Sequence, residues 1–304
     1  MSKIQGQVWF MLIERIIPKE LHNKNILTAI KKLCPNIPVS VIHKAFRKKD
    51  VKYNGIRVPK ETLVQEGGKV SVYGVEEMTS GKKADIIVYE DQNIYIVDKP
   101  QGMAVHSGRT YTGEETLIDL LEKQAGQKLH LCHRLDRNTG GLMMVAKTKP
   151  VLDEMLKRMA EGQIRKEYTA LVLGRIEPGR HTETAWLEKN ARMNMVFVKS
   201  EMTDNSFKIV TTYEMVENKD MEGLEVTKIL VKPETGRTHQ IRAHMAYFGH
   251  PILGDGKYGD NSANKRLRMN KQQLFSTLLS FDYDNDGSLT GYLAGKKFER
   301  QVVW

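Results

Sequence analysis

The segment LCHRLDRNTGGL, residues 131–142, is the most informative part of this 304-residue chain. It places one acid, Asp136, in a turn that also contains two arginines, a threonine and two glycines. The apolar run LMMVA at residues 142–146 predicts a buried strand directly after the turn. Glycine permits tight backbone geometry, and nearby arginines favour an ionised carboxylate. We therefore expect a turn that presents one charged carboxylate; a turn held by structural ion pairs is the alternative interpretation of these residues alone.

The composition describes a basic chain with enough apolar residues for a large core. The formal net charge is +10, and 40% of the residues are hydrophobic. The positive charge favours a polyanionic partner without saying which one. Two cysteines are too few for a disulfide scaffold and fit a reducing compartment. The sequence shows no secretory signal pattern and no run long enough to span a membrane. We expect a soluble, monomeric, cytoplasmic protein with no membrane partner.

Residues 1–80 are expected to form a small separate module. Helical patterns cover residues 26–33 and 39–46, the second with Ser40 as its N-cap. Asn54-Gly55 marks a hairpin turn within residues 50–58, and another strand is expected at 67–73. Basic residues cluster here, which indicates either a solvated face or contacts with RNA phosphates; the candidate contacts are Lys44, Arg47, Lys48 and Arg57.

Residues 86–304 are expected to form the larger unit, after a polar linker at 76–85. The strand patterns lie at 86–89, 94–97, 142–146, 164–173, 208–216 and 224–231. Helices are expected at 116–125 and from Pro150 to about residue 160. The mixture of many strands and few helices predicts an α+β protein with a mixed, mostly antiparallel sheet.

Two segments imitate metal sites. In TGRTHQIRAH, residues 235–244, the two histidines are five residues apart, no Glu lies between them, and the arginines would repel a cation. Near the C-terminus, Asp282, Asp284 and Asp286 copy the start of a calcium loop, but Leu293 occupies the position of the essential Glu. We expect no metal and no cofactor. The arginines are better suited to pairing with a carboxylate or a phosphate.

Four ordered motifs resemble the RluA-type pseudouridine synthases. They are KPQGMAVH at 99–106, HRLDRNTGGL at 133–142, TGRTHQIRAH at 235–244 and HPILGDGKY at 250–258. The N-terminal order of two helices, VKYNG and GGKVSVY resembles the small alpha-L RNA-binding domain. Two departures from the family pattern are Gly140, where Ser is usual, and Phe275-Ser276, where His-Ala is usual.

The resemblance implies that the chain isomerises uridine in RNA, with the base flipped out of its stack. Asp136 would be the catalytic carboxylate, either adding covalently to ribose or base or acting on a ribose proton. Arg237 would pair with Asp136, and Tyr168 would stack on the base and relay a proton. Further RNA contacts are expected from Arg134, which would fill the vacated stack, and from His106, Lys166, His239, Arg242 and Leu274.

Ribosomal RNA of the large subunit is the expected substrate, and a tRNA-directed enzyme is the alternative. A non-catalytic RNA-binding or ribosome-assembly protein of the same fold is the competing functional class. Loss of the catalytic candidates would favour that class, and the sequence retains all three.

Overall fold

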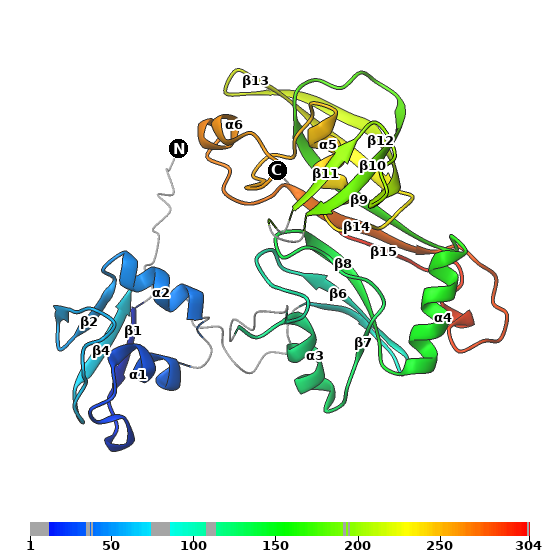
Figure 1. The fold of residues 1–304 in the computed structure, drawn as a ribbon. Coiled ribbons are helices and arrows are strands. Elements are labelled where there is room, and N and C mark those ends of the chain that lie inside the picture. The colour runs from blue at the N-terminus through cyan, green and yellow to red at the C-terminus, as the bar shows by residue number, and fades with distance from the viewer. Residues whose placement is uncertain are drawn as a thin grey trace, which may run out of the picture. The chain divides into compact units, whose positions relative to one another are not determined.

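The computed structural model describes residues 12–34, 37, 39–73, 86–107, 114–190, 193, 195–302 and 304. By its internal contacts the chain divides into a small N-terminal unit and a larger unit that holds most of the remaining residues (Figure 1). The two units are described separately. The expected linker at 76–85 lies outside the described residues.

The small unit is a four-stranded antiparallel sheet with two helices and a short 3-10 turn, and its strand order is β1-β4-β2-β3. The Asn54-Gly55 turn is confirmed, and both residues have positive φ angles. Helix α2 begins at Val39, so Ser40 lies in its first turn and is not the N-cap. The elements are β1 (Leu12–Ile16), η1 (Lys19–Leu21), α1 (Ile26–Leu33), α2 (Val39–Arg47), β2 (Val51–Tyr53), β3 (Ile56–Arg57) and β4 (Lys69–Tyr73).

The larger unit is built on an 11-stranded mixed sheet, so the α+β prediction is confirmed. Its main order is β11-β10-β12-β13-β9-β14-β8-β6-β5, with β15 beside β14 and β7 beside β8. All the described strand pairs are antiparallel except β8 with β14. The strands are β5 (Ile87–Glu90), β6 (Ile94–Lys99), β7 (His130–Leu131), β8 (Gly140–Ala146), β9 (Ile164–Leu173), β10 (Arg180–Asn190), β11 (Met195–Lys199), β12 (Ser206–Met221), β13 (Leu224–Pro233), β14 (Leu274–Phe281) and β15 (Lys297–Glu299).

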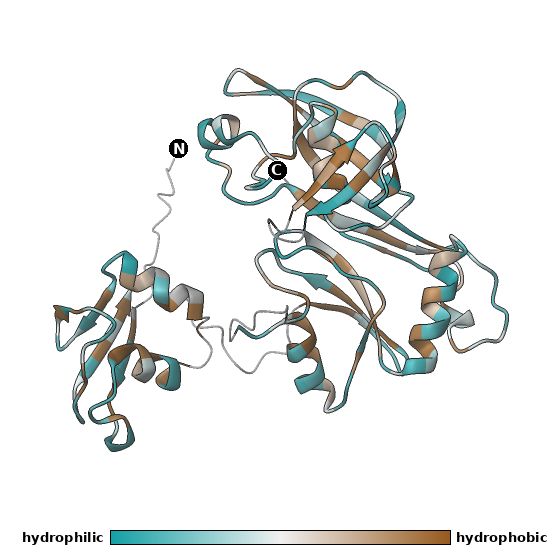
Figure 2. Cartoon of the chain, in the orientation of Figure 1, coloured by the Kyte–Doolittle hydropathy of each residue, from teal (hydrophilic) through white to brown (hydrophobic). Residues whose placement is uncertain are grey.

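The predicted buried strand is β8, and both of its faces are covered. Met143 and Val145 belong to one core cluster together with leucines of helix α3 (Leu117–Ala125). Leu142 and Met144 belong to another, together with residues of helix α4 (Lys149–Ala160). Because successive side chains of a strand point to opposite faces, burial on both sides requires an unbroken apolar run. Figure 2 shows the matching pattern on α4, where hydrophobic and hydrophilic residues alternate along the helix.

Helix α5 (Gln240–Tyr247) packs against β11 and β12 at the other end of the sheet (Figure 1). The remaining helical elements are α6 (Asn261–Arg266) and η2 (Gly291–Leu293). Two features support the predicted helix starts: Thr116 forms a capping box with Asp119, and Pro150 lies in the first turn of α4. No helix in the described part of the chain is long and apolar enough to cross a membrane.

The acidic segment near the C-terminus surrounds an arginine. Arg158 of α4 is 5% exposed and donates from Nη2 to both carboxylate oxygens of Asp286, at 2.9 and 2.8 Å. It also pairs with Glu154 at 3.2 Å. Among the described residues, no group of three or more His, Cys, Asp or Glu side chains gathers as metal ligands would.

Candidate active site

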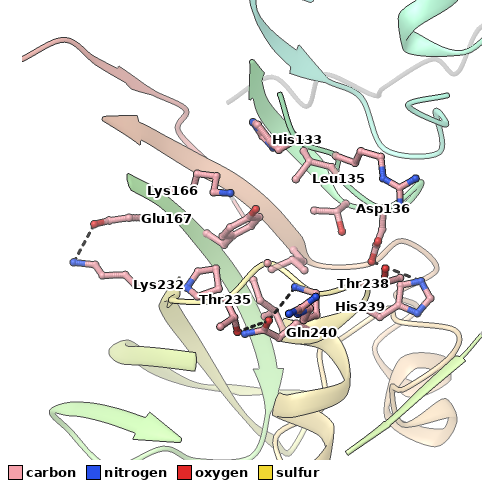
Figure 3. Close-up of a pocket in the computed structure, with 18 of the residues that line it drawn as sticks. His133, Leu135, Asp136, Lys166, Glu167, Lys232, Thr235, Thr238, His239 and Gln240 are labelled. Carbon is pink, nitrogen blue, oxygen red and sulfur yellow. Dashed lines mark hydrogen bonds and ion pairs between the residues drawn. The ribbon is translucent and has the colours of Figure 1, made fainter. Parts of the chain in front are cut away.

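A cavity of about 1080 Å³ in the larger unit lies where β9, the Asp136 turn and the segment before α5 meet (Figure 3). Its volume is at the upper end for small-molecule sites, so it can hold more than one base. Figure 3 shows Leu135 and Asp136 on one side, with Thr235 and Gln240 on another. Basic side chains outnumber acidic ones in the wall. The basic residues are Arg134, Arg137, Arg165, Lys166, Arg180, Lys232, Arg237 and Arg242, and the acids are Asp136, Glu167 and Glu234.

The turn that carries Asp136 is held from several sides. Lys99, whose side chain is fully buried, donates from Nζ to the carbonyl oxygens of Pro100, Met103 and Arg137 at 2.9–3.0 Å. Burial lowers the pKa of Lys99 to about 8, although the negative charge of Asp136 acts in the opposite direction. These bonds link the KPQG turn to the backbone directly after Asp136, so the carboxylate is presented from a fixed support.

Only glycine fits at the second glycine position of the turn. Gly141 has a φ of +108°, and a Cβ at this position would lie 2.1 Å from the carbonyl oxygen of Ser276. This close approach is where β8 pairs in parallel with β14. Beyond it, Gln272 donates to the hydroxyl of Thr139 at 2.7 Å, and both side chains are buried. The turn is therefore tied to β14 as well as to the KPQG segment.

The partner of Asp136 is Arg242, and the prediction that Arg237 forms this pair is wrong. Nη1 of Arg242 donates to Oδ2 of Asp136 at 2.8 Å. The other edge of the same guanidinium forms a two-bond contact with Asp255, from Nε at 2.7 Å and Nη2 at 2.9 Å. Arg237 is exposed, and its guanidinium lies over the ring of Phe207.

Arg242 reaches Asp136, and Arg237 does not, for a simple geometric reason. Arg242 is inside helix α5 and 6% exposed, whereas Arg237 precedes the helix. The residue before the helix, His239, has a positive φ of 55°, so the chain changes direction between the two arginines. Asp255 belongs to the motif HPILGDGKY at 250–258, but its role as a second partner of Arg242 was not predicted. Burial alone would raise the pKa of Asp255, but the hydrogen bonds and charge of Arg242 and two backbone N–H groups lower it.

One oxygen of Asp136 remains available to a substrate. The side chain is 25% exposed, and no described residue donates a hydrogen bond to Oδ1. The ion pair at Oδ2 fixes the direction of the carboxylate, because a guanidinium binds in a defined plane. The arrangement is a carboxylate that is oriented on one side and open to the cavity on the other.

Tyr168 of β9 lines the same cavity and is 8% exposed. Burial, and then the charge of Asp136, raises the pKa of its hydroxyl above the ordinary value. The hydroxyl therefore stays protonated at neutral pH, and it can donate a proton or a hydrogen bond but is a poor base. Leu274 of β14 is 3% exposed and adds an apolar part to the wall. Together they can receive the face of a flat base.

His239 is joined to both sides of the site. Its Nδ1 lies 2.9 Å from the hydroxyl of Tyr258, and its Nε2 lies 3.9 Å from Oδ2 of Asp136. The Tyr258 hydroxyl already accepts the N–H of Val196 at 2.8 Å, so its own proton is directed to Nδ1. Burial lowers the pKa of His239, against the charge of Asp136. A neutral ring with its proton on Nε2, facing Asp136, satisfies these contacts.

Lys166 and His133 provide hydrogen-bond donors in another part of the wall. Nε2 of His133 accepts the N–H of Met144 at 3.1 Å, which places the ring proton on Nδ1. That Nδ1 is buried without a partner. Burial, and then the charge of Lys166, lowers the pKa of His133 to about 3. No described residue accepts a hydrogen bond from the Lys166 ammonium, so it is available to a phosphate or a carbonyl oxygen.

The remaining predicted contacts divide between the two units. Arg134 contacts His106 at the cavity wall. In the small unit, Arg47, Lys48 and Arg57 are exposed, and the side chain of Lys44 lies outside the described residues. All of the RNA-contact candidates of the larger unit therefore lie on one cavity; they are Arg134, His106, Lys166, His239, Arg242 and Leu274.

The two departures from the family motif are in contact with each other. Gly140 pairs with Phe275 across the parallel strands β8 and β14. A Cβ at residue 140 would lie 2.9 Å from Cδ1 of Phe275 and 3.1 Å from Cγ of Gln101. The ring of Phe275 also contacts Trp304 and the guanidinium of Arg300. The large ring at 275 thus fills space that a side chain at 140 would need.

Comparisons with known proteins agree with this geometry. Residues 93–247, about half of the chain, match the family model described as RNA pseudouridylate synthase. The chain is 32% identical over 277 residues to "Ribosomal large subunit pseudouridine synthase C" of Vibrio cholerae, covering 86% of this chain and 83% of that protein. The protein of the same name from Escherichia coli strain K12 is also 32% identical over 277 residues, with 83% of each chain covered.

Solved structures show the same fold. "Human RNA Pseudouridylate Synthase Domain Containing 1" aligns with a TM-score of 0.59 and 26% identity, over 74% of this chain and 86% of that one. "Human RNA Pseudouridylate Synthase Domain Containing 4" aligns with a TM-score of 0.51 and 25% identity, over 64% of this chain and 82% of that one.

Proposed function

We propose that this chain, which belongs to the RNA pseudouridylate synthase family, isomerises uridines of large-subunit ribosomal RNA with Asp136 as its catalytic carboxylate. The observation that carries the proposal is the state of Asp136: Oδ2 is fixed by Arg242 at 2.8 Å, while Oδ1 is open to a basic cavity. The choice of ribosomal RNA rests on the names of the two bacterial relatives.

The reaction moves the uracil from one bond to another. The bond between uracil N1 and ribose C1′ breaks, a bond forms between C5 and C1′, the proton on C5 leaves and N1 gains a proton. Atoms and electrons balance within the nucleotide and the solvent. Asp136 would act through Oδ1, either by adding to the ribose or the base or by removing a ribose proton. Arg242 keeps that carboxylate oriented, which both routes require.

The cavity residues have distinct parts in this proposal. Tyr168 and Leu274 would hold the flipped uracil, and the protonated hydroxyl of Tyr168 could supply a proton but not remove one. His239 would stabilise the orientation of Asp136 from the other side of Oδ2. Lys166 and the Nδ1 proton of His133 would bind a phosphate or a uracil carbonyl oxygen.

The test of this proposal replaces Asp136. Asp136→Asn keeps the size of the side chain but removes its charge and most of its nucleophilicity. The substrate is a transcript of large-subunit ribosomal RNA labelled with tritium at C5 of uridine, because isomerisation releases that hydrogen to water. We expect tritium release to fall below detection while RNA affinity stays within about threefold. A rate within about tenfold of wild type, roughly 1.4 kcal/mol of barrier, would overturn the role of Asp136.

Selectivity for the RNA is tested with two transcripts. The same assay on labelled transfer RNA separates the proposed substrate from the alternative one. Release from transfer RNA alone would replace ribosomal RNA as the substrate and leave the reaction unchanged.

The basic residues of the small unit are proposed to bind RNA phosphates. Arg47, Lys48 and Arg57 are exposed, and phosphate contacts give affinity that falls with salt. We expect replacement of all three by Gln in the full chain to make the slope of log affinity against log salt concentration shallower. The change should correspond to the loss of up to about three phosphate contacts. An unchanged slope would show that these residues form only a solvated face.

A further inference from the structure

The arginine that does not pair with Asp136 has another partner. The guanidinium carbon of Arg237 lies 4.4 Å from the centre of the Phe207 ring. Phe207 is 50% exposed, and Arg237 is also exposed. An exposed phenylalanine alone needs no explanation. Here, however, the planar guanidinium of Arg237 covers the ring. Arg237 is also part of the cavity wall, so the pair lies at the edge of the cavity.

The backbone holds these two side chains on a common support. Gln240, 3% exposed, donates to the carbonyl oxygen of Val210 at 3.1 Å and to the hydroxyl of Thr211 at 3.2 Å. The carbonyl oxygen of its side chain accepts the backbone N–H of Arg237 at 3.1 Å. Thr211 and Phe207 are both on β12. The loop that carries Arg237 is therefore anchored to the strand that carries Phe207.

The charge and position of this pair favour a nucleotide. Arg237 brings its own positive charge, and it lines a cavity whose wall holds more basic than acidic side chains. Aromatic rings and guanidinium planes stack on nucleobases of any sequence, and nearby positive charge attracts the phosphate backbone. A pair that is already stacked offers one more layer without having to order a flexible arginine first.

We propose that Phe207 and Arg237 form a stacking platform for the base of an unpaired nucleotide that flanks the flipped uridine. The proposal rests on the RNA synthase function proposed above and adds a subsite outside the catalytic centre. The flanking base would stack on the exposed part of the pair, while the uridine occupies the cavity beside Asp136. The platform would then act on RNA binding and placement, and not on the bond-breaking step.

The sheet provides a matched control. In the register of β10, Phe207 is opposite Leu187 and Phe197 is opposite the next residue, Glu188. Because neighbouring residues of a strand point to opposite faces, the two phenylalanines lie on opposite faces of the same sheet. Phe197 is 41% exposed, close to the value for Phe207. Phe197→Leu therefore repeats the loss of an exposed ring without touching Arg237.

The experiment measures base stacking directly in the full chain. The probe is a 12-nucleotide single-stranded oligouridylate with one 2-aminopurine, whose fluorescence falls when the base stacks. Its position is moved along the strand. With wild-type protein we expect quenching at a defined position. Phe207→Leu should abolish this quenching and weaken binding about tenfold, within the range measured for loss of one stacked base. Phe207→Trp should keep both.

The outcomes separate this proposal from the function it rests on. With labelled ribosomal RNA at saturation, Phe207→Leu should keep its single-turnover tritium release within about twofold. Phe197→Leu should resemble wild type in every measurement. Equal behaviour of Phe207→Leu and Phe197→Leu, with wild-type protein active, would overturn the platform alone. Absence of tritium release from wild-type protein would instead refute the synthase function, and the quenching assay would still report on stacking.

Discussion

Two arginines in the larger unit hold two carboxylates each, and they do so to different ends. Arg158 connects Glu154 and Asp286 beside helix α4. Arg242 connects Asp136 and Asp255 at the cavity. Both guanidinium groups are almost fully buried, and both have an aromatic ring beside them, Tyr283 and Tyr258 respectively.

The two sites differ in the surroundings of the acid that keeps one oxygen without a hydrogen-bond donor. At the Arg158 site, Glu154 Oε1 also accepts the backbone N–H of Thr290 at 3.0 Å and the hydroxyl of Ser288 at 2.7 Å. Asp286 uses both of its oxygens on Arg158. At the Arg242 site both oxygens of Asp255 are bonded, and Oδ1 of Asp136 has no donor among the described residues. Oε2 of Glu154 also has no described donor, but Asp136 lines the basic cavity and Glu154 does not.

This difference distinguishes a structural ion-pair network from a site prepared for chemistry. A buried charge is tolerated when its hydrogen bonds are complete, and such a network contributes little beyond joining the segments it connects. A carboxylate that is oriented, incompletely bonded and open to a cavity remains able to bind or attack another group. Arg158 thus fixes the loop after β14 to α4, and Arg242 holds a cavity-lining carboxylate beside Asp255.

The largest effect is expected for Arg242→Lys. Lysine keeps the charge but cannot hold two carboxylates with one planar fork. We expect the single-turnover rate of bound RNA to fall about 100-fold, comparable to losing one preorganised donor at a reacting charge. Arg237→Lys is the matched control and should change that rate less than about threefold.

Thermal unfolding of both lysine variants would confirm that they remain folded. A rate loss confined to Arg237→Lys would contradict the assignment of Arg242 as the functional partner of Asp136.

The complementary change is Arg158→Met, which should affect stability and leave the chemistry intact. Loss of the guanidinium leaves Glu154 partly buried without its cationic partner. The side chain of Asp286 is 54% exposed and can be hydrated instead. We expect a loss of about 3 kcal/mol in the free energy of unfolding, the lower end for breaking a buried ion pair. Denaturant unfolding measures this loss. The rate of bound RNA should remain within about twofold, and a larger decrease would show that α4 supports the reaction directly.

A smaller effect is expected at the junction of β8 and β14. Gly140→Ser would bring a Cβ within 2.9 Å of Phe275, so the ring must move. We expect a loss of about 1–2 kcal/mol in unfolding free energy, typical of moderate overpacking. Adding Phe275→His should recover part of it, which a double-mutant cycle would detect. Gly256→Ser, where the added Cβ meets no neighbour within 4 Å, should have almost no effect.

Local patterns in the sequence were sufficient for much of the fold. The strand at 164–173 is β9 with the same bounds, and the helix at 26–33 is α1. The hairpin at Asn54-Gly55 and the start of α3 were also predicted. Each of these depends on residues within about ten positions, where side-chain periodicity, caps and turn preferences act directly. The hairpin of β10 and β11 was not predicted, because its strands contain the consecutive apolar residues 185–187 and 195–198 and not a regular alternation.

The carboxylate proposed to be catalytic, Asp136, could be named from the sequence, but its partner could not. Asp136 and its turn belong to one short motif, whereas Arg237 and Arg242 lie five residues apart in another and carry the same charge. Only the start of α5 at Gln240 and the packing of that helix decide which guanidinium reaches Asp136, 106 residues earlier in the chain. The sequence by itself determined the chemical groups and their local elements. The tertiary structure determined which groups meet, because contacts across a sheet depend on register and packing that no local pattern encodes.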